Sequence, residues 1–129
     1  MLDKETIMVD DHEIKLLNKR IPEKNMWNDN NADYVFETTG KFLTKEQADK
    51  HNSKYFIMCA PAKDDTPQFL FNGNHDKYKG EKIISNSSCT TNCIVPLIKI
   101  LNNDYKIDSS NFITIHAVTG SQNVLDGVH

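Results

Sequence analysis

The residues with the clearest chemical potential lie in the stretch ISNSSCTTNCIVPLI, residues 84–98. Cys89 follows Ser87 and Ser88, precedes Thr90 and Thr91, and leads into an apolar pattern of helical spacing. Free backbone N–H groups at a helix N-terminus stabilise a thiolate, so Cys89 would be a reactive thiol there. The hydroxyls and the same N–H groups also favour an oxyanion or a phosphate. From these residues alone, a buried structural thiol beside capping hydroxyls remains the alternative.

A reactive thiol also needs a basic or cationic partner, and the chain has five histidines. His116 is the candidate, because it lies in a segment typical of a buried strand. The hydroxyls of Thr119 and Ser121 follow it and could bind a second anion. The alternative for His116 is a core histidine without a catalytic role. We predict that the remaining histidines are solvated: His12, His51, His75 and His129.

The other two cysteines give weaker signals. Cys93 lies one helical turn after Cys89, but no second ligand pair accompanies them, so we predict packing rather than a metal site. Cys59 lies in a predicted buried strand and is expected to be inert. An odd cysteine count without a disulfide framework indicates a reducing compartment, and we predict a cytoplasmic protein.

The elements that must position these residues alternate between strands and helices. The predicted order is a hairpin turning at residues 10–12, a helical turn near Pro22, a buried strand at 34–36, a capped helix at 45–51, a buried strand at 55–61, a short strand at 83–84, a helix at 89–102 and a strand at 111–118. This alternation favours an α/β layer with a largely parallel sheet. Pro96 conflicts with the last helix, which must either begin after Cys89 or bend.

Bulk composition narrows the class of protein. A chain of 129 residues corresponds to about one domain. The net charge of −3 and the pI of about 5.9 argue against a nucleic-acid partner or an anionic membrane surface. The sequence contains no apolar run long enough to predict a transmembrane helix.

The motif SNSSCTTNC (residues 85–93), followed by TIHAVTGSQ (residues 114–122), resembles the glyceraldehyde-3-phosphate dehydrogenase family. WNDNNADYVFETTGKF, CAPAKDDTPQF and NGNHDKYKGEKIISN are similar to that family in the same order, so the resemblance covers essentially the whole chain. It implies the later part of a Rossmann-like doubly wound parallel sheet in residues 1–88. Residues 89–129 would begin an α+β catalytic domain, and both parts would be incomplete.

The resemblance also implies a reaction. Cys89 would attack the aldehyde of glyceraldehyde 3-phosphate, hydride would pass to NAD, and inorganic phosphate would release the thioester as 1,3-bisphosphoglycerate. His116 would activate the thiol and act as the acid–base group. The two phosphate sites would be lined by Ser88, Thr90, Thr119 and Ser121. The family usually has a threonine at the position of Ser121.

On the cofactor side, the resemblance assigns Arg20, Thr39, Gly40, Phe42 and Cys59 to the surroundings of the dinucleotide. Cys59 replaces the usual serine, which leaves its hydrogen bond to the cofactor open. The choice between NAD and NADP also stays open, and the complete protein is expected to be a homotetramer.

Several family features are absent from these 129 residues. The five glycines make no Gly-x-Gly-x-x-Gly turn, and Arg20, the sole arginine, cannot act as the clamp for substrate phosphate. We therefore expect a segment of well under half of an enzyme, inactive and poorly soluble in isolation. The alternatives are a truncated, non-catalytic interaction module or a related erythrose-4-phosphate dehydrogenase.

Overall fold

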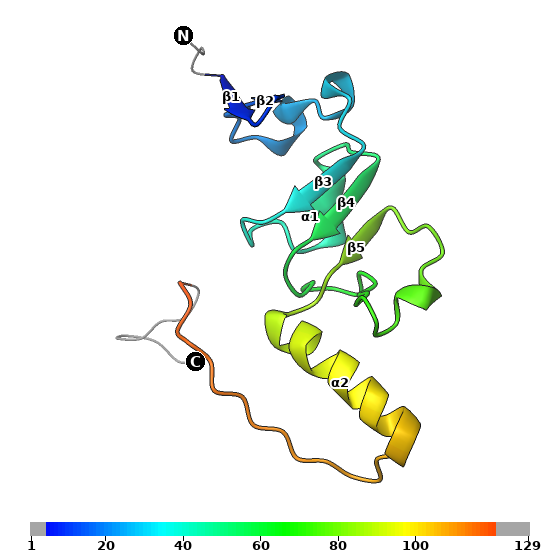
Figure 1. Ribbon diagram of the computed structural model, residues 1–129. Helices are drawn as coiled ribbons and strands as arrows, with labels where there is room; N and C mark the ends of the chain where they lie inside the picture. The colour runs from blue at the N-terminus through cyan, green and yellow to red at the C-terminus, as the bar shows by residue number, and fades with distance from the viewer. Residues whose placement is uncertain (1–4, 121–129) are drawn as a thin grey trace, which may run out of the picture.

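The computed structural model describes residues 5–120, whose elements alternate largely as predicted (Figure 1). The strands are β1 (Thr6–Val9), β2 (His12–Lys15), β3 (Tyr34–Glu37), β4 (Tyr55–Met58) and β5 (Ile83–Ser85). The helices are α1 (Lys45–Asp49) and α2 (Cys89–Tyr105), with three short 3-10 turns, η1 (Pro22–Asn25), η2 (Asn28–Asn30) and η3 (His75–Lys77). Within residues 5–120, no helix has the length and apolar character needed to cross a membrane.

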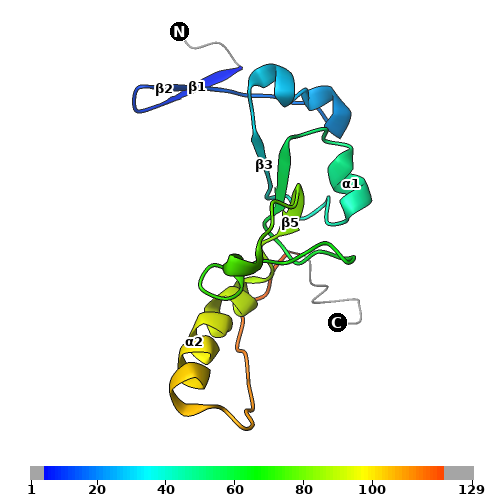
Figure 2. The same cartoon turned by 90° about the vertical axis from the view of Figure 1, so that its right-hand side faces the viewer.

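Strands β3, β4 and β5 form a parallel sheet in that order, which confirms the α/β prediction. The register aligns Val35, Phe56 and Ile83 on one face, where all three side chains are buried. Ala48 of α1 and Leu43 of the preceding loop complete this core, and α1 lies against that side of the sheet (Figure 2). The hydrophobic core is therefore formed by one face of a small sheet and one short helix.

The opposite face of the sheet is open. Tyr34 and Phe36 of β3 are 58% and 60% exposed, and the Tyr34 ring stacks on that of Tyr55 with centroids 5.0 Å apart. Alternate side chains of a strand point to opposite faces, and on this face the two side chains of β3 stay exposed while those of β4 and β5 are half-buried. The prediction that β3 is buried on both faces was therefore wrong.

The capping box predicted for α1 is confirmed. The Thr44 hydroxyl accepts from the Gln47 backbone N–H, and the Gln47 side chain accepts from the Thr44 backbone N–H. These two bonds satisfy N–H groups that the first helical turn leaves without intrahelical partners. The helix ends at Asp49, two residues earlier than predicted.

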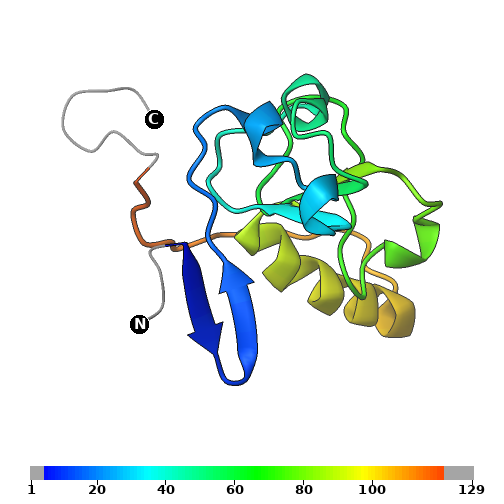
Figure 3. The same cartoon turned by 90° about the horizontal axis from the view of Figure 1, so that it is seen from above.

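The β1–β2 hairpin is antiparallel with Asp10 and Asp11 at its turn, as predicted, and projects from the rest of the chain (Figure 3). The segment after it reaches the α/β unit through Trp27, whose indole Nε1–H donates to His51 Nδ1 at 3.4 Å. His51 is buried at 7% exposure, and its ring contacts those of Phe42 and Phe56. The prediction of a solvated His51 was wrong, because two aromatic rings and the indole enclose it.

Helix α2 begins at Cys89 as predicted and extends to Tyr105, three residues beyond the predicted end. Pro96 lies inside the helix, so the alternative in which the helix begins later is wrong. A proline has no backbone N–H, and the carbonyl of Asn92 therefore loses its usual intrahelical partner. Leu97 and Leu101, on the apolar face predicted for this helix, are about half exposed, at 53% and 48%.

The strand predicted at residues 111–118 does not form. These residues run back beside α2 without ladder hydrogen bonds (Figure 1), and Ile113 and Ile115 are 88% and 98% exposed. A β-branched sequence favours extended backbone, but a strand also requires a neighbour to pair with. None of the strands among residues 5–120 supplies that neighbour.

Candidate active site

The start of α2 positions the thiol. Ser88 is the N-cap residue, with extended backbone angles of φ −90° and ψ 160°, and its Oγ accepts from the Thr91 backbone N–H at 3.0 Å. The Ser88 and Thr91 hydroxyls also lie 2.6 Å apart. Cys89 is therefore the first helical residue, at the end where unpaired N–H groups carry partial positive charge.

The structure brings Cys89 and His116 together, although 27 positions separate them in the sequence. Cys89 Sγ lies 3.3 Å from His116 Nε2, and His116 Nδ1 lies 2.6 Å from the Ala117 carbonyl oxygen. Because a carbonyl oxygen only accepts, Nδ1 carries a proton and Nε2 faces the sulfur. Both residues are exposed, which contradicts the prediction of a buried strand around His116.

Hydrogen bonding favours the charged forms of both groups. The bond to His116 lowers the pKa of the Cys89 thiol, and the hydroxyl and backbone N–H of Thr90 lower it further. The bond to the Ala117 carbonyl, followed by the bond to Cys89, raises the pKa of His116. A thiolate paired with an imidazolium is the state that both shifts favour.

A hollow of about 400 Å³ opens beside this pair, between the first turns of α2 and residues 112–116. Ile94, Phe112 and Ile115 give it a largely apolar wall. Cys93 also lines it and is exposed, which disagrees with the packing role predicted for this residue. Within the described residues, no group of three or more potential metal ligands surrounds this cysteine pair or any other position.

The predicted phosphate-binding hydroxyls fall into two groups. Ser88 and Thr90 flank Cys89 at the start of α2, where the N-cap bond already engages the Ser88 hydroxyl. Thr119 lies on the extended segment, three residues beyond His116. Ser121 lies outside the described residues.

Three predicted cofactor residues lie after the carboxyl ends of adjacent parallel strands. Thr39 and Gly40 follow β3, and Cys59 follows β4, with its backbone N–H donating to the Glu37 carbonyl oxygen at 3.0 Å. Ligands of open α/β sheets bind at this edge. Cys59 is exposed and outside the strand, so its predicted burial was wrong because β4 ends at Met58.

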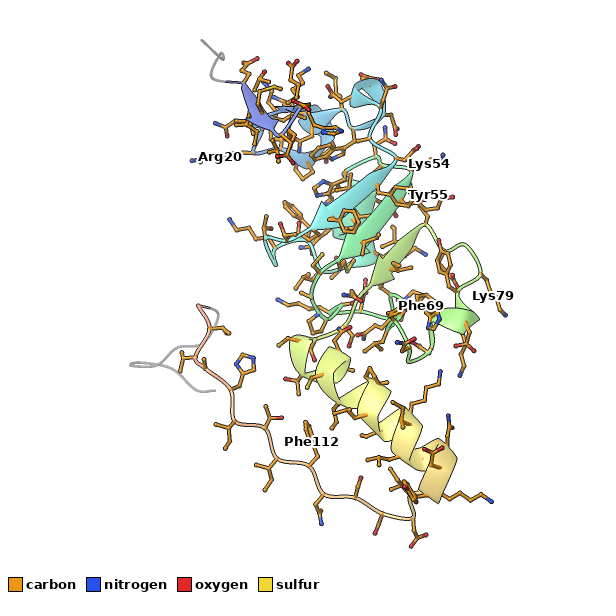
Figure 4. The ribbon with its side chains drawn as sticks, viewed as in Figure 1. Arg20, Lys54, Tyr55, Phe69, Lys79 and Phe112 are labelled. Atoms are coloured by element: carbon orange, nitrogen blue, oxygen red, sulfur yellow. The ribbon has the colours of Figure 1, made fainter. Side chains whose placement is uncertain are left out.

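The other two predicted cofactor residues are placed differently. Phe42 packs against the core, with its ring edge-on to His51 at 4.8 Å between centroids. Arg20 lies beside the hairpin, at the far end of the molecule from α2 (Figure 4). The structure therefore does not bring Arg20 to the carboxyl edge of the sheet.

Sequence reasoning missed Asn92, which lies in the first turn of α2. Its Nδ2 donates to the Asn86 carbonyl oxygen at 2.6 Å and to the Ser88 carbonyl oxygen at 2.9 Å. The signal was an amide side chain four positions after a helix N-cap, which can reach back to the segment before the helix. That segment, Asn86–Ser88, connects β5 to Cys89.

Comparison with known proteins supports the resemblance. Residues 88–129 match the family model described as glyceraldehyde 3-phosphate dehydrogenase, C-terminal domain. The cytosolic glyceraldehyde-3-phosphate dehydrogenase of Trypanosoma brucei brucei is 43% identical over 94% of the chain and 38% of its own length. The enzymes of Bacteroides fragilis and Escherichia coli K12 are 44% and 41% identical over 94% of the chain, covering 37% and 38% of their own lengths.

The chain thus spans less than half of the length of the curated relatives it matches, and 37–38% of these three. The family model begins at Ser88, the N-cap residue of α2, and therefore includes both Cys89 and His116. Sequence identity of 41–44% over 94% of the chain agrees with the resemblance carried by the motifs at residues 85–93 and 114–122. Over nearly its whole length, the chain is similar to members of the glyceraldehyde-3-phosphate dehydrogenase family.

Proposed function

We propose that Cys89 and His116 are the nucleophile and the acid–base group of an NAD-dependent, phosphorylating glyceraldehyde-3-phosphate dehydrogenase. The observation that carries this proposal is the 3.3 Å approach of Cys89 Sγ to His116 Nε2 at the start of α2. A thiolate is the attacking species in such chemistry, and the hydrogen bonds around Cys89 lower its pKa.

The two side chains would act in sequence. Cys89 Sγ attacks the aldehyde carbon, a C–S bond forms, and the carbonyl oxygen takes the displaced electron pair and a proton from His116 Nε2. As the hydride leaves the carbon, His116 Nε2 would take back the hydroxyl proton, and the thioester forms. A phosphate oxygen then attacks the same carbon and the C–S bond breaks. The products are the acyl phosphate and the Cys89 thiolate, which again pairs with His116.

The hydroxyl groups around the pair would bind the two phosphates, that of the substrate and the inorganic one. Ser88 and Thr90 lie beside the thiol, where backbone N–H groups of the helix start add to the attraction for an anion. Thr119 and Ser121 are assigned by the resemblance to the same role.

NAD, when bound, would supply the acceptor for the hydride that leaves the hemithioacetal carbon. The described residues fit a cofactor at the carboxyl edge of the sheet: Gly40 has φ +71°, and open space surrounds the position that a Cβ would take there. Thr39 and Cys59 flank that edge. For Arg20 and Phe42, the assignment rests on the resemblance alone, as do the homotetramer and the cytoplasmic location.

The test is an enzyme assay with glyceraldehyde 3-phosphate, phosphate and NAD. It uses the natural gene product, at the length that this product has in its own cells. We expect Cys89→Ser to abolish NADH formation and His116→Asn to slow it about 100-fold or more. Cys93→Ser, one helical turn away, is the matched control and should retain most of the activity. Full turnover by the Cys89→Ser variant would contradict the proposal.

A further inference from the structure

We propose that Asn92 is a positioning residue, whose side-chain amide holds segment 86–88 in the conformation that points Cys89 at His116. The inference rests on the proposed role of Cys89. The Cys89 thiol is exposed and contacts no core residue that would fix its direction. The orientation of Cys89 must therefore come from the backbone that precedes it.

That backbone is unfavourable by itself. Ser87 has φ +60°, in the left-handed region that residues with a Cβ enter at a cost of about 1 kcal/mol or more. Such a conformation persists only where surrounding contacts impose it. Segment 86–88 has two sets of contacts, one from the sheet and one from α2.

The contacts from the sheet hold the beginning of the segment. Ser85 is fully buried, and its hydroxyl donates to the Ala60 carbonyl oxygen at 2.7 Å and accepts from the Ser87 backbone N–H at 3.0 Å. The Asn86 backbone N–H donates to the Met58 carbonyl oxygen at 2.8 Å. These bonds fix the N–H groups of Asn86 and Ser87 but leave the carbonyl groups of the segment without partners in the sheet.

The contacts from α2 hold the end of the segment through Ser88, whose Oγ accepts from the Thr91 backbone N–H at 3.0 Å and whose carbonyl oxygen accepts from the Asn92 backbone N–H at 2.9 Å. The side-chain amide of Asn92 is the contact from α2 that also reaches Asn86. One Nδ2 group donates to the carbonyl oxygens of Asn86 and Ser88, which lie on the two sides of the left-handed residue. These two bonds span the left-handed residue and connect segment 86–88 to the first turn of α2. Removal of the amide leaves the Asn86 carbonyl without its bond to α2, so the turn at Ser87 is no longer spanned, whereas Ser88 keeps its bonds to the backbone N–H groups of Thr91 and Asn92. Cys89 would then spend less time aligned with His116 and with the free N–H groups of the helix start.

The test is the pH dependence of Cys89 alkylation by iodoacetamide in the intact chain, with each cysteine followed by peptide mass. In Asn92→Ala we expect the apparent pKa of Cys89 to rise by about one unit, which is about tenfold slower alkylation at low pH. Cys93 in the same molecule should keep its profile. Asn102→Ala, an asparagine replacement near the other end of α2, is the matched control and should leave Cys89 unchanged.

Asn92→Ser provides a second variant in case the alanine variant does not fold. A serine hydroxyl inside a helix bonds the carbonyl four residues back, so this variant keeps the bond to Ser88 and loses the one to Asn86. We expect an intermediate profile. If folded Asn92 variants lose thermal stability but keep the wild-type Cys89 profile, the amide has only a structural role and the inference is overturned. If wild-type Cys89 itself titrates like a free thiol, the proposed function fails instead.

Discussion

The α/β unit of residues 33–86 buries its central side chains, whereas the segment of residues 89–120 has no buried side chain. Phe56 and Met58 are fully buried in the first region. In the second, α2 has no buried residue, and Ile115 is 98% exposed. The fold is therefore stabilised in one region, while the candidate chemistry lies in the other, joined to it by segment 86–88.

This difference indicates how the thiol is activated. Burial raises the pKa of a thiol, but Cys89 is exposed, so its lowered pKa comes from hydrogen bonds and from its place at the helix start. Such interactions are local and screened by salt. Variants that damage the core should therefore unfold the protein, whereas variants in the second region should change reactivity and leave the fold intact.

The largest expected effect is a difference between the two regions in how much a Phe→Ala substitution lowers the free energy of unfolding. Phe56→Ala should lower the free energy of unfolding by about 3–5 kcal/mol, because it empties a fully buried site. Phe112→Ala, the same substitution at a side chain that is 57% exposed, should cost less than about 1 kcal/mol. Urea unfolding followed by the fluorescence of Trp27, the sole tryptophan, measures both. Equal losses would contradict the division between the regions.

The next effect concerns reactivity. His116→Asn removes the first cause of the lowered pKa of Cys89, so thiolate should form at higher pH. We expect alkylation of Cys89 to slow about tenfold at low pH, which corresponds to one pKa unit. His12→Asn, at an exposed position of β2, is the control and should have no effect. If the two variants behave alike, the 3.3 Å contact has no role in activating the thiol.

A third effect is the pH dependence of the stability of the α/β unit. Desolvation lowers the pKa of His51, opposed by Glu37 and Glu23, so the folded state favours neutral imidazole. As the pH falls, His51 of the unfolded chain is therefore protonated at a higher pH than His51 of the folded protein. Stability is thus full above the ordinary value of about 6.5 and falls below it.

Urea midpoints at about pH 7.5 and about pH 5.5 test this sign. The wild-type protein should lose stability on acidification, and Trp27, which donates to His51, should report the change in its fluorescence. His51→Gln cannot titrate and should lose less over the same interval. An equal loss in both proteins would assign the pH dependence to other groups.

The smallest effect concerns self-association of the exposed segment. Residues 112–118, FITIHAV, are rich in β-branched and aromatic residues, contain no Asp, Glu, Lys or Arg and pair with no strand, which is the pattern of an aggregation-prone segment. Ile115→Lys should lower the light scattering of concentrated solutions, whereas Asn103→Lys adds the same charge on α2 and should not. Unchanged scattering for Ile115→Lys would exclude this segment as the contact between copies.

The sequence predicted the local elements well where their causes are local. The capping box at Thr44 and Gln47, the hairpin turn at Asp10 and Asp11, and the start of α2 at Cys89 all depend on residues a few positions apart. The parallel sheet also followed from the alternation of elements. Burial was predicted less well, because a run of apolar residues does not reveal which face another element will cover.

The errors share that cause. Residues 111–118 have the composition of a strand, but pairing needs a neighbour at a distant sequence position. His51 was expected in solvent because its partners, Trp27 and Phe56, meet only in the folded chain. Cys89 and His116 were matched by residue type and resemblance. The role of Asn92 depends on the left-handed turn at Ser87, which no pattern in the sequence indicates.

The most direct test of the central claim is the pH profile of alkylation of Cys89 in the wild-type chain, with Cys93 as the reference in the same molecule. The hydrogen bonds to Cys89 lower the pKa of its thiol and predict half-maximal reactivity below the free-cysteine value of about 8.5. Coincident profiles near the free-cysteine value would show that α2 and His116 do not activate the thiol, and the account of the site would be wrong.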